Sequence, residues 1–161
     1  MNDSRILSEL SMRPAHPGDI ENIWSLLGTY AKERLLLPRS QEDIASRLKN
    51  FRIAELDGVF VGCVAIRDYG GGLYEVRSLA VAKEFNNHGI GSAIVTAACD
   101  FLRAKGEPVR LFALTYRAHF FERLGFRIVD RSQFPEKIWS DCAICPKRKN
   151  CDETAVLIRL P

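Results

Sequence analysis

The stretch from Ser78 to Gly91 constrains the fold of this chain more than any other. It begins with Ser78-Leu79-Ala80-Val81, which is typical of a strand, and it ends with Asn86-Asn87-His88-Gly89-Ile90-Gly91 ahead of an apolar pattern with helical spacing. A strand, a glycine-bearing turn and a helix start leave backbone N–H groups at the positive end of the helix dipole. Because such a turn cradles phosphate groups, we expect a nucleotide-like cofactor there.

The composition is that of a soluble globular protein with one domain over residues 1–161. Hydrophobic residues make up 47% and charged residues 27%, and the net charge of +3 is too small to indicate a nucleic-acid partner. No apolar stretch approaches the roughly 20 residues that span a bilayer, and the N-terminus lacks the basic and apolar segments of a signal peptide. We therefore expect a cytoplasmic protein that binds neither nucleic acid nor membrane.

The first half of the chain predicts a strand, two helices and a hairpin. The strand covers Met12–Ala15 after a variable lead-in, and Asp19 is a candidate cap for a helix whose apolar positions run to Tyr30. Ser40 begins a second helix in a capping-box-like pattern. Asp57-Gly58 between two β-branched, aromatic-rich runs predicts a two-residue hairpin turn.

The second half predicts four more strands and two helices. Three glycines at 70–72 lead into a strand at 73–81, and a helix at 90–105 ends near Gly106. A buried strand at 109–114, a short helix at 117–124 and strands at 126–130 and 154–160 follow. The whole order predicts an α/β fold with a mixed sheet flanked by helices.

An irregular segment at 131–153 holds three of the five cysteines. Cys142 and Cys145 have the spacing of metal ligands, and Cys151 is a candidate third ligand of a structural zinc. The alternative is three reduced thiols in a loop, since no fourth ligand stands out. Cys63 lies in a predicted strand and Cys99 in a predicted helix, and we expect both to be small residues of the core.

Several motifs together resemble the GNAT family of acyl-CoA N-acyltransferases. They are Leu79-Ala80-Val81, Gly89-Ile90-Gly91 and Phe120-Phe121-Glu122-Arg123-Leu124-Gly125-Phe126, and the resemblance covers about residues 12–160. It implies the family fold, a central mixed sheet with splayed strands, and acetyl-CoA as co-substrate. The family's phosphate turn begins with Arg or Gln, whereas this chain has Asn86.

A narrower resemblance is to the acetyltransferase domain of N-acetylglutamate synthases, in its short single-domain form. Its motifs are Leu36-Leu37-Pro38-Arg39-Ser40, Glu75-Val76-Arg77-Ser78-Leu79-Ala80-Val81, Phe112-Ala113-Leu114-Thr115-Tyr116 and Pro135-Glu136-Lys137-Ile138-Trp139. It implies transfer of an acetyl group to the α-amino group of an amino acid. The implied acceptor is L-glutamate, in the first step of arginine biosynthesis.

The GNAT resemblance also implies how acetyl-CoA binds. The pyrophosphate would lie on the N–H groups of residues 87–92, and the pantetheine arm would pair with the preceding strand, which a bulge splays from its neighbour. The alternative is a tight turn that binds nothing. The cofactor-binding candidates are Leu79, Ala80, Val81, Asn86, Asn87, His88, Gly89, Ile90, Gly91 and Ser92.

Glu75 is the candidate general base, because the family often places there a carboxylate that acts through water. Strict alternation puts Glu75, Arg77, Leu79 and Val81 on one face of the strand, and a solvated pair of Glu75 with Arg77 is the alternative. Phe121 occupies the position of the tyrosine acid of many GNAT proteins. Tyr116 is the nearest candidate to replace it, although a tyrosine at a strand end also packs its ring.

The acceptor side depends on arginines, because glutamate carries two carboxylates. Arg39 matches the arginine of the synthase-like pattern, and Arg67 and Arg117 are further candidates, with ordinary surface charges as the alternative. The function alternatives are a GNAT enzyme for another small amine or a protein N-terminus, and a sensor of acyl-CoA or amino acid without turnover. A homodimer is compatible with the sequence, which does not determine the oligomeric state.

Overall fold

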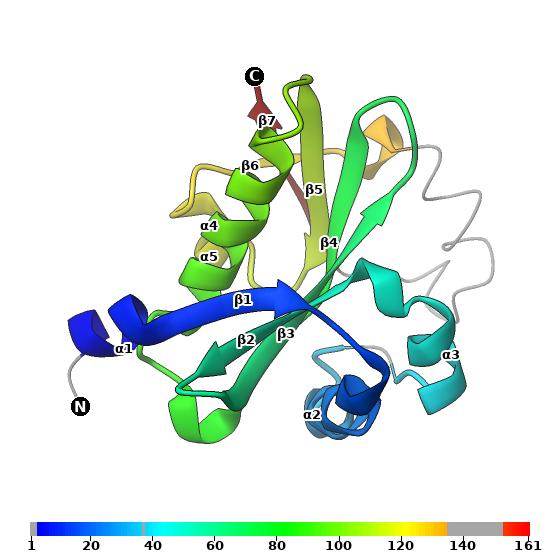
Figure 1. The fold of residues 1–161 in the computed structure, drawn as a ribbon. Coiled ribbons are helices and arrows are strands. Elements are labelled where there is room, and N and C mark those ends of the chain that lie inside the picture. The colour runs from blue at the N-terminus through cyan, green and yellow to red at the C-terminus, as the bar shows by residue number, and fades with distance from the viewer. Residues whose placement is uncertain (1–2, 37, 135–152) are drawn as a thin grey trace. The chain divides into compact units, whose positions relative to one another are not determined.

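The computed structural model describes residues 3–36, 38–134 and 153–161 (Figure 1). Its helices are α1 (Asp3–Glu9), α2 (Ile20–Lys32), α3 (Gln41–Ser46), α4 (Ile90–Arg103) and α5 (Ala118–Glu122). Its strands are β1 (Leu10–Pro14), β2 (Phe51–Leu56), β3 (Val59–Asp68), β4 (Leu73–Val81), β5 (Val109–Thr115), β6 (Arg127–Val129) and β7 (Thr154–Leu160). No helix in these described ranges is long and apolar enough to cross a membrane.

The strands form a sheet with the order β1-β2-β3-β4-β5-β7-β6. The β4–β5 pair is parallel, while β1–β2, β2–β3, β5–β7 and β6–β7 are antiparallel. This confirms the predicted mixed sheet. By its internal contacts the chain divides into two compact units, Met1–Ile66 with Val76–Phe101 and Arg67–Glu75 with Leu102–Pro161, and the division falls within β4.

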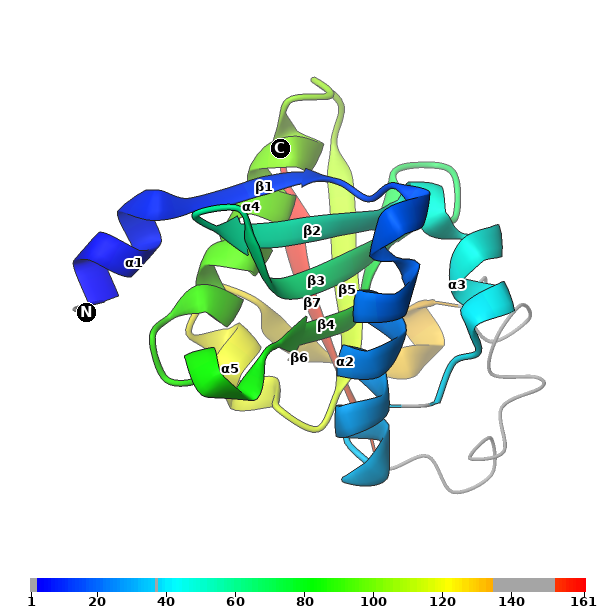
Figure 2. The same cartoon turned by 60° about the horizontal axis from the view of Figure 1, so that its bottom comes forward.

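The first unit is built on the β1–β2–β3 meander. Figure 2 shows α2 crossing in front of β2 and β3. The apolar stripe of α2 supplies Ile23, Leu26 and Leu27 to the core of this unit, as the helical spacing predicted. They pack with buried side chains from the strands and α3, among them Phe51, Ile53, Cys63, Ala65 and Ile44.

The hairpin prediction is confirmed, and so is the cap of α3. Asp57 and Gly58 join β2 to β3 with φ angles of 52° and 77°, the left-handed values that a type I′ turn requires. The backbone N–H of Asp43 donates to Ser40 Oγ at 3.1 Å, which makes Ser40 the N-cap of α3. Local turn and cap chemistry therefore fixed these boundaries.

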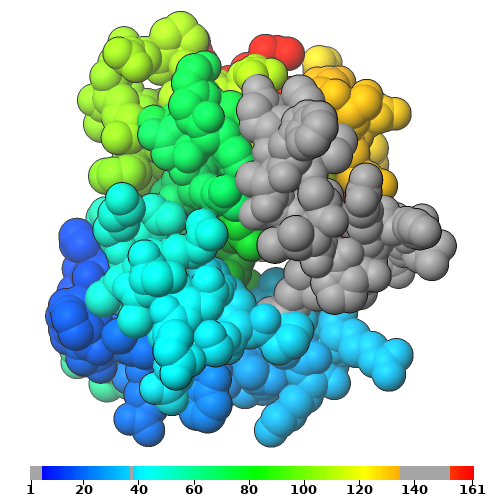
Figure 3. Space-filling model, turned by 90° about the vertical axis from the view of Figure 1, so that its right-hand side faces the viewer, coloured from blue at the N-terminus to red at the C-terminus, as the bar shows by residue number. Residues whose placement is uncertain are grey.

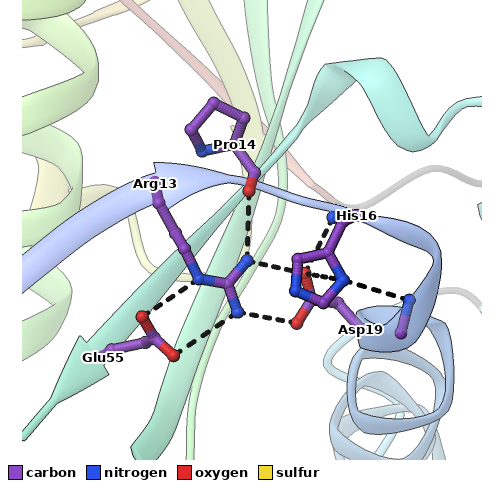
Figure 4. Close-up of polar contacts among 6 residues, drawn as sticks. Arg13, Pro14, His16, Asp19 and Glu55 are labelled. Atoms are coloured by element: carbon purple, nitrogen blue, oxygen red, sulfur yellow. Dashed lines mark hydrogen bonds and ion pairs between the residues drawn. The ribbon is translucent and has the colours of Figure 1, made fainter. Parts of the chain in front are cut away.

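Asp19 occupies the predicted N-cap position of α2, but it does not cap the helix through its side chain, and the first strand begins earlier than expected. Asp19 makes no side-chain cap bond to α2; its carboxylate accepts the His16 backbone N–H at 2.8 Å and the Arg13 guanidinium instead (Figure 4). A charged partner on β1 thus outcompetes the helix terminus. The lead-in contains α1, and β1 runs over Leu10–Pro14, in register with β2.

The second unit has its own core, built largely on aromatic rings. Phe112 of β5 stacks on Phe134 with the ring centroids 4.0 Å apart, and the Tyr69 ring lies 5.9 Å from that of Phe112. Leu73, Ala155 and Leu157 complete the buried cluster. Leu73 of this core is the first residue of β4, which pairs with β5 as Leu73–Arg110, Tyr74–Leu111 and Glu75–Phe112.

Candidate active site

The turn that precedes α4 has the geometry of an anion-binding helix start. Asn87 and Gly89 have φ angles of 67° and 80°, and α4 begins at Ile90. A side chain at residue 89 would be strained by this φ, so glycine suits the position. The first helical hydrogen bond runs from Ala93 N–H to Gly89 O at 3.0 Å. The N–H groups of Ile90, Gly91 and Ser92 therefore precede the helical ladder and are candidate phosphate donors.

Strand β4 is interrupted at Ser78. This residue has a φ of 51°, which an L-residue adopts in a strand at a cost of about 1–2 kcal/mol. Glu75 and its neighbour Val76 are both buried. The predicted alternation from Glu75 through Arg77 to Val81 is therefore not continuous, because a left-handed residue reverses the period of the pleat.

The backbone after Ser78 is held from two sides in the first unit. The Tyr30 hydroxyl donates to Val81 O at 2.5 Å, and Ala82 N–H donates to Val61 O at 2.8 Å. A Cβ on Gly62 of β3 would come within 2.7 Å of Ala80 O, so only glycine admits this close approach. The candidates Leu79, Ala80 and Val81 thus lie on a fixed length of backbone.

Arg39 is drawn into the first unit rather than lying on its surface. Figure 3 shows the residues of α3, in cyan, at the surface, while the Arg39 side chain just ahead of them is only 10% exposed. Its Nε donates to Asp43 Oδ2 at 2.7 Å and its Nη1 donates to Ser78 Oγ at 3.0 Å. The guanidinium also lies 5.1 Å from the centroid of the Phe51 ring. Among the described residues, two of its five N–H donors are engaged.

Two predicted site residues, Glu75 and Arg67, belong to one cluster in the second unit. The Glu75 side chain is buried, with 3% of the residue exposed, and its Oε1 accepts a hydrogen bond from the Tyr69 hydroxyl at 2.8 Å. The Arg67 guanidinium lies over the Tyr69 ring, 4.6 Å from its centroid. The predicted pairing of Glu75 with Arg77 on a solvated strand does not describe this buried carboxylate.

Tyr116 and Arg117 are not beside Glu75. Glu75 is opposite Phe112 in the parallel pair, and β5 continues to Thr115 before these two residues. At about 3.3 Å per residue, the end of β5 lies about 10 Å further along the strand. Tyr116 is half-buried, whereas Arg117 is exposed at the start of α5.

The zinc prediction falls on residues outside the described ranges, namely Cys142, Cys145 and Cys151. Elsewhere in the chain, where side chains are described, no three His, Cys, Asp or Glu residues are grouped as metal ligands. Cys63 and Cys99 are buried, as expected. Burial raises the pKa of the Cys63 thiol to about 12, which makes this residue unsuitable as a nucleophile.

The sequence pattern did not single out Tyr69 or Ser78 as site residues. For Tyr69 a signal exists, because the glycine turn at 70–72 closes a hairpin in which Tyr69 N–H donates to Leu73 O at 2.9 Å. In that register Glu75 is the diagonal neighbour of Tyr69. For Ser78 no local signal exists, because serine has no preference for a left-handed conformation inside a strand.

Comparison with known proteins gives a consistent family. The model of the acetyltransferase (GNAT) domain matches residues 47–128, about half of the chain. An uncharacterized N-acetyltransferase of Chlorobaculum tepidum is 39% identical over 150 residues, which are 93% of this chain and 96% of that protein. An amino-acid acetyltransferase of Neisseria meningitidis is 31% identical over 93% of this chain, but the match spans only 34% of that longer protein.

The solved structures agree with the sequence relatives. The N-acetylglutamate synthase of Neisseria gonorrhoeae, complexed with coenzyme A and N-acetyl-glutamate, matches 94% of this chain with a TM-score of 0.83 and 28% identity, over 35% of its own length. Since the family model covers half of the residues and a 39% identical relative spans nearly the whole length, the chain belongs to the GNAT family of acetyltransferases.

Proposed function

We propose that this GNAT protein transfers the acetyl group of acetyl-CoA to the α-amino group of an amino acid, and that the acceptor is L-glutamate. The proposal that the acceptor is an amino acid rests on Arg39. This arginine is largely buried, and its contacts with the described residues use only two of its five N–H donors. An anionic acceptor needs such a donor, and the planar guanidinium binds carboxylates in bidentate geometry. Arg67 is the proposed second cation, whereas the exposed Arg117 has less support.

Glu75 is the proposed acceptor of the proton that the amine loses, directly or through water. An α-ammonium has a pKa of about 8, so only a modest driving force is needed near neutral pH. The Tyr69 hydroxyl donates to one carboxylate oxygen of Glu75, at 2.8 Å, and so sets the orientation of the carboxylate. Tyr69 is thus a positioning residue for the base.

The reaction that we propose is a direct attack. Glu75 takes one proton from the α-ammonium, the amine nitrogen forms a bond to the thioester carbonyl carbon, the C–S bond breaks, and the second proton that the nitrogen loses goes to the departing thiolate. Backbone N–H groups of β4, at Leu79 or Val81, would polarise the carbonyl oxygen. The thiolate of coenzyme A leaves without a strong acid, because its pKa is about 8.5, and Tyr116 is the candidate that returns a proton.

The relatives support this assignment in two ways. A Mycobacterium tuberculosis protein solved in complex with coenzyme A matches 94% of this chain and 99% of its own chain, with a TM-score of 0.79. The amino-acid acetyltransferase of Neisseria meningitidis spans nearly the whole of this chain, although this chain has only about a third of that protein's length. We accordingly propose a cytoplasmic role in arginine biosynthesis.

A thiol-release assay with acetyl-CoA and each of the common amino acids tests the proposal. We expect turnover with L-glutamate well above that with L-glutamine or uncharged amino acids. Turnover only with another amine or a peptide N-terminus would contradict the acceptor, and binding of acetyl-CoA without turnover would indicate a sensor. Glu75→Gln is expected to lower kcat about 100-fold with the acetyl-CoA affinity retained, whereas the exposed Glu107→Gln is expected to have no effect.

Arg39→Ala separates the acceptor assignment from general damage. We expect the KM for glutamate to rise about 30-fold or more, because a charge-assisted bidentate contact is lost. The matched control is Arg47→Ala, because Arg47 pairs with the same Asp43 at a longer 3.6 Å. A normal glutamate KM in Arg39→Ala would remove this arginine from the acceptor site.

Tyr69→Phe tests the positioning of the base. Loss of one hydrogen bond to the carboxylate is expected to lower kcat about 5-fold with the acetyl-CoA KM unchanged. Tyr74→Phe removes the same hydroxyl from the residue next to Glu75 and serves as the control. A wild-type kcat in Tyr69→Phe would contradict the role.

A further inference from the structure

We infer that Ser78 is a positioning residue for acetyl-CoA, and that its side chain works by holding the interruption of β4 through Arg39. The inference rests on the proposed function, because it takes the backbone of Leu79–Val81 as the part that receives acetyl-CoA. It adds a residue outside the cradle and assigns Arg39 a second task beside acceptor binding. The juxtaposition that carries it is the Ser78 hydroxyl 3.0 Å from the Arg39 guanidinium.

Ser78 is held in a conformation that it would not adopt alone. Its φ of 51° lies in the left-handed region, where the Cβ of an L-residue is crowded by its own backbone. A residue stays in this region only when its surroundings over-determine it. The same φ turns the peptide groups that follow, so the directions of the N–H and C=O groups of Leu79–Val81 depend on it.

Two contacts over-determine Ser78. Arg39 Nη1 donates to its side-chain oxygen, and the buried Cys63 thiol donates to its carbonyl oxygen at 3.5 Å. Arg39 is fixed in turn by Asp43 and by the Phe51 ring. Asp43 itself lies in the first turn of α3, which Ser40 caps. The conformation of β4 is therefore tied to α3 through a single guanidinium.

The stretch beyond Ser78 leaves little freedom for other adjustments. The Tyr30 hydroxyl holds Val81 O, and the close approach of Gly62 to Ala80 O fixes the position of the middle residue. Because these two carbonyl groups are fixed, the φ angle of Ser78 determines the direction in which β4 continues into residues 79–81. We therefore infer that the conformation of residue 78 sets the orientation of the backbone that binds acetyl-CoA.

The test compares two substitutions at residue 78. Ser78→Ala keeps the Cβ, and with it the strain, but loses the bond to Arg39. Ser78→Gly loses the bond and the strain together, because glycine adopts a positive φ readily. Binding of coenzyme A is measured by calorimetry without any acceptor, and the urea midpoint of unfolding is measured for each variant.

We expect Ser78→Ala to weaken coenzyme A binding 5- to 10-fold and to lower the urea midpoint. Ser78→Gly should bind within about 2-fold of the wild type and recover much of the midpoint. Arg39→Ala should weaken coenzyme A binding as Ser78→Ala does. The double variant Arg39→Ala/Ser78→Ala should bind coenzyme A no more weakly than either single variant. Ser46→Ala, which removes an exposed hydroxyl from α3, should change nothing.

The outcomes separate this inference from the proposed function. Wild-type affinity in Ser78→Ala, or equal weakening in Ser78→Ala and Ser78→Gly, would overturn the role of Ser78 even if the protein acetylates glutamate. A protein that binds coenzyme A in the expected variant order but acetylates another amine would support the role while the proposed acceptor fails. A wild-type chain that does not bind coenzyme A would overturn both.

Discussion

Two arginines of the first unit, Arg13 and Arg39, have opposite patterns of hydrogen bonding. All five N–H donors of Arg13 are used, by the carboxylates of Asp19 and Glu55 and by the Pro14 carbonyl (Figure 4). Arg39 uses two donors within the described part of the chain, on Asp43 and Ser78. Arg13 thus meets two negative charges, whereas among the described residues Arg39 pairs with one carboxylate, that of Asp43, and shares it with Arg47.

The difference shows how a structural arginine is distinguished from a candidate binding arginine. Arg13 links β1, β2 and the turn before α2, and has no N–H left for a ligand. Among its contacts with described residues, Arg39 retains N–H donors for the carboxylate of a ligand. The Asp43 carboxylate balances its charge before the ligand binds. The two arginines therefore differ more in how many of their N–H donors are already hydrogen-bonded than in how deeply they are buried.

The largest expected effect is on stability, at Arg13. Arg13→Ala leaves the Asp19 side chain, which is 6% exposed, without its main partner, and we expect a loss of about 3 kcal/mol in the free energy of unfolding. Arg39→Ala should cost only about 1 kcal/mol, because the Asp43 side chain is 41% exposed. Urea unfolding at neutral pH measures both.

The effects on the KM for the acceptor should have the opposite order, with a larger effect in Arg39→Ala than in Arg13→Ala. The KM for the acceptor should stay near the wild-type value in Arg13→Ala if the variant is assayed well below its midpoint of unfolding. A large loss of stability in Arg39→Ala with an unchanged acceptor KM would break the distinction drawn from donor saturation.

A smaller effect is expected from pH. The Arg13 guanidinium holds the pKa of Asp19 below its ordinary value, against the opposing effect of burial. Since the folded pKa is lower than the unfolded value of about 3.9, the stabilisation is present above that pH and is lost as pH falls through the folded pKa. We expect the acid loss of stability to be shallower in Asp19→Asn than in the wild type.

Unfolding curves measured between pH 6 and pH 2 check this expectation. Part of the slope should survive in Asp19→Asn, because the Ser132 backbone N–H also lowers the pKa of Asp130. An acid slope in Asp19→Asn equal to that of the wild type would show that the Arg13 cluster does not set acid stability.

Most of the elements were predictable, because their signals are local. The Asp57-Gly58 turn, the Ser40 cap, the β4 boundaries and the α4 start all follow from turn chemistry or helical periodicity. Asp19 takes the predicted N-cap position but its carboxylate bonds Arg13, because the same residue type serves as a helix cap and as a partner for arginine. Only the register of β1 on β2, which brings Arg13 beside Glu55, decides between these roles.

The candidate site divides along the same line. The sequence by itself determined the family motifs, the glycine turn before α4 and the candidate residues Glu75, Arg39 and Arg67, because each lies in a recognisable stretch of chain. The tertiary structure decided that Ser78 is left-handed and that Arg39 holds it. Arg39 and Ser78 are 39 residues apart, and only the packing of the chain around α3 and β4 brings their side chains within hydrogen-bonding distance.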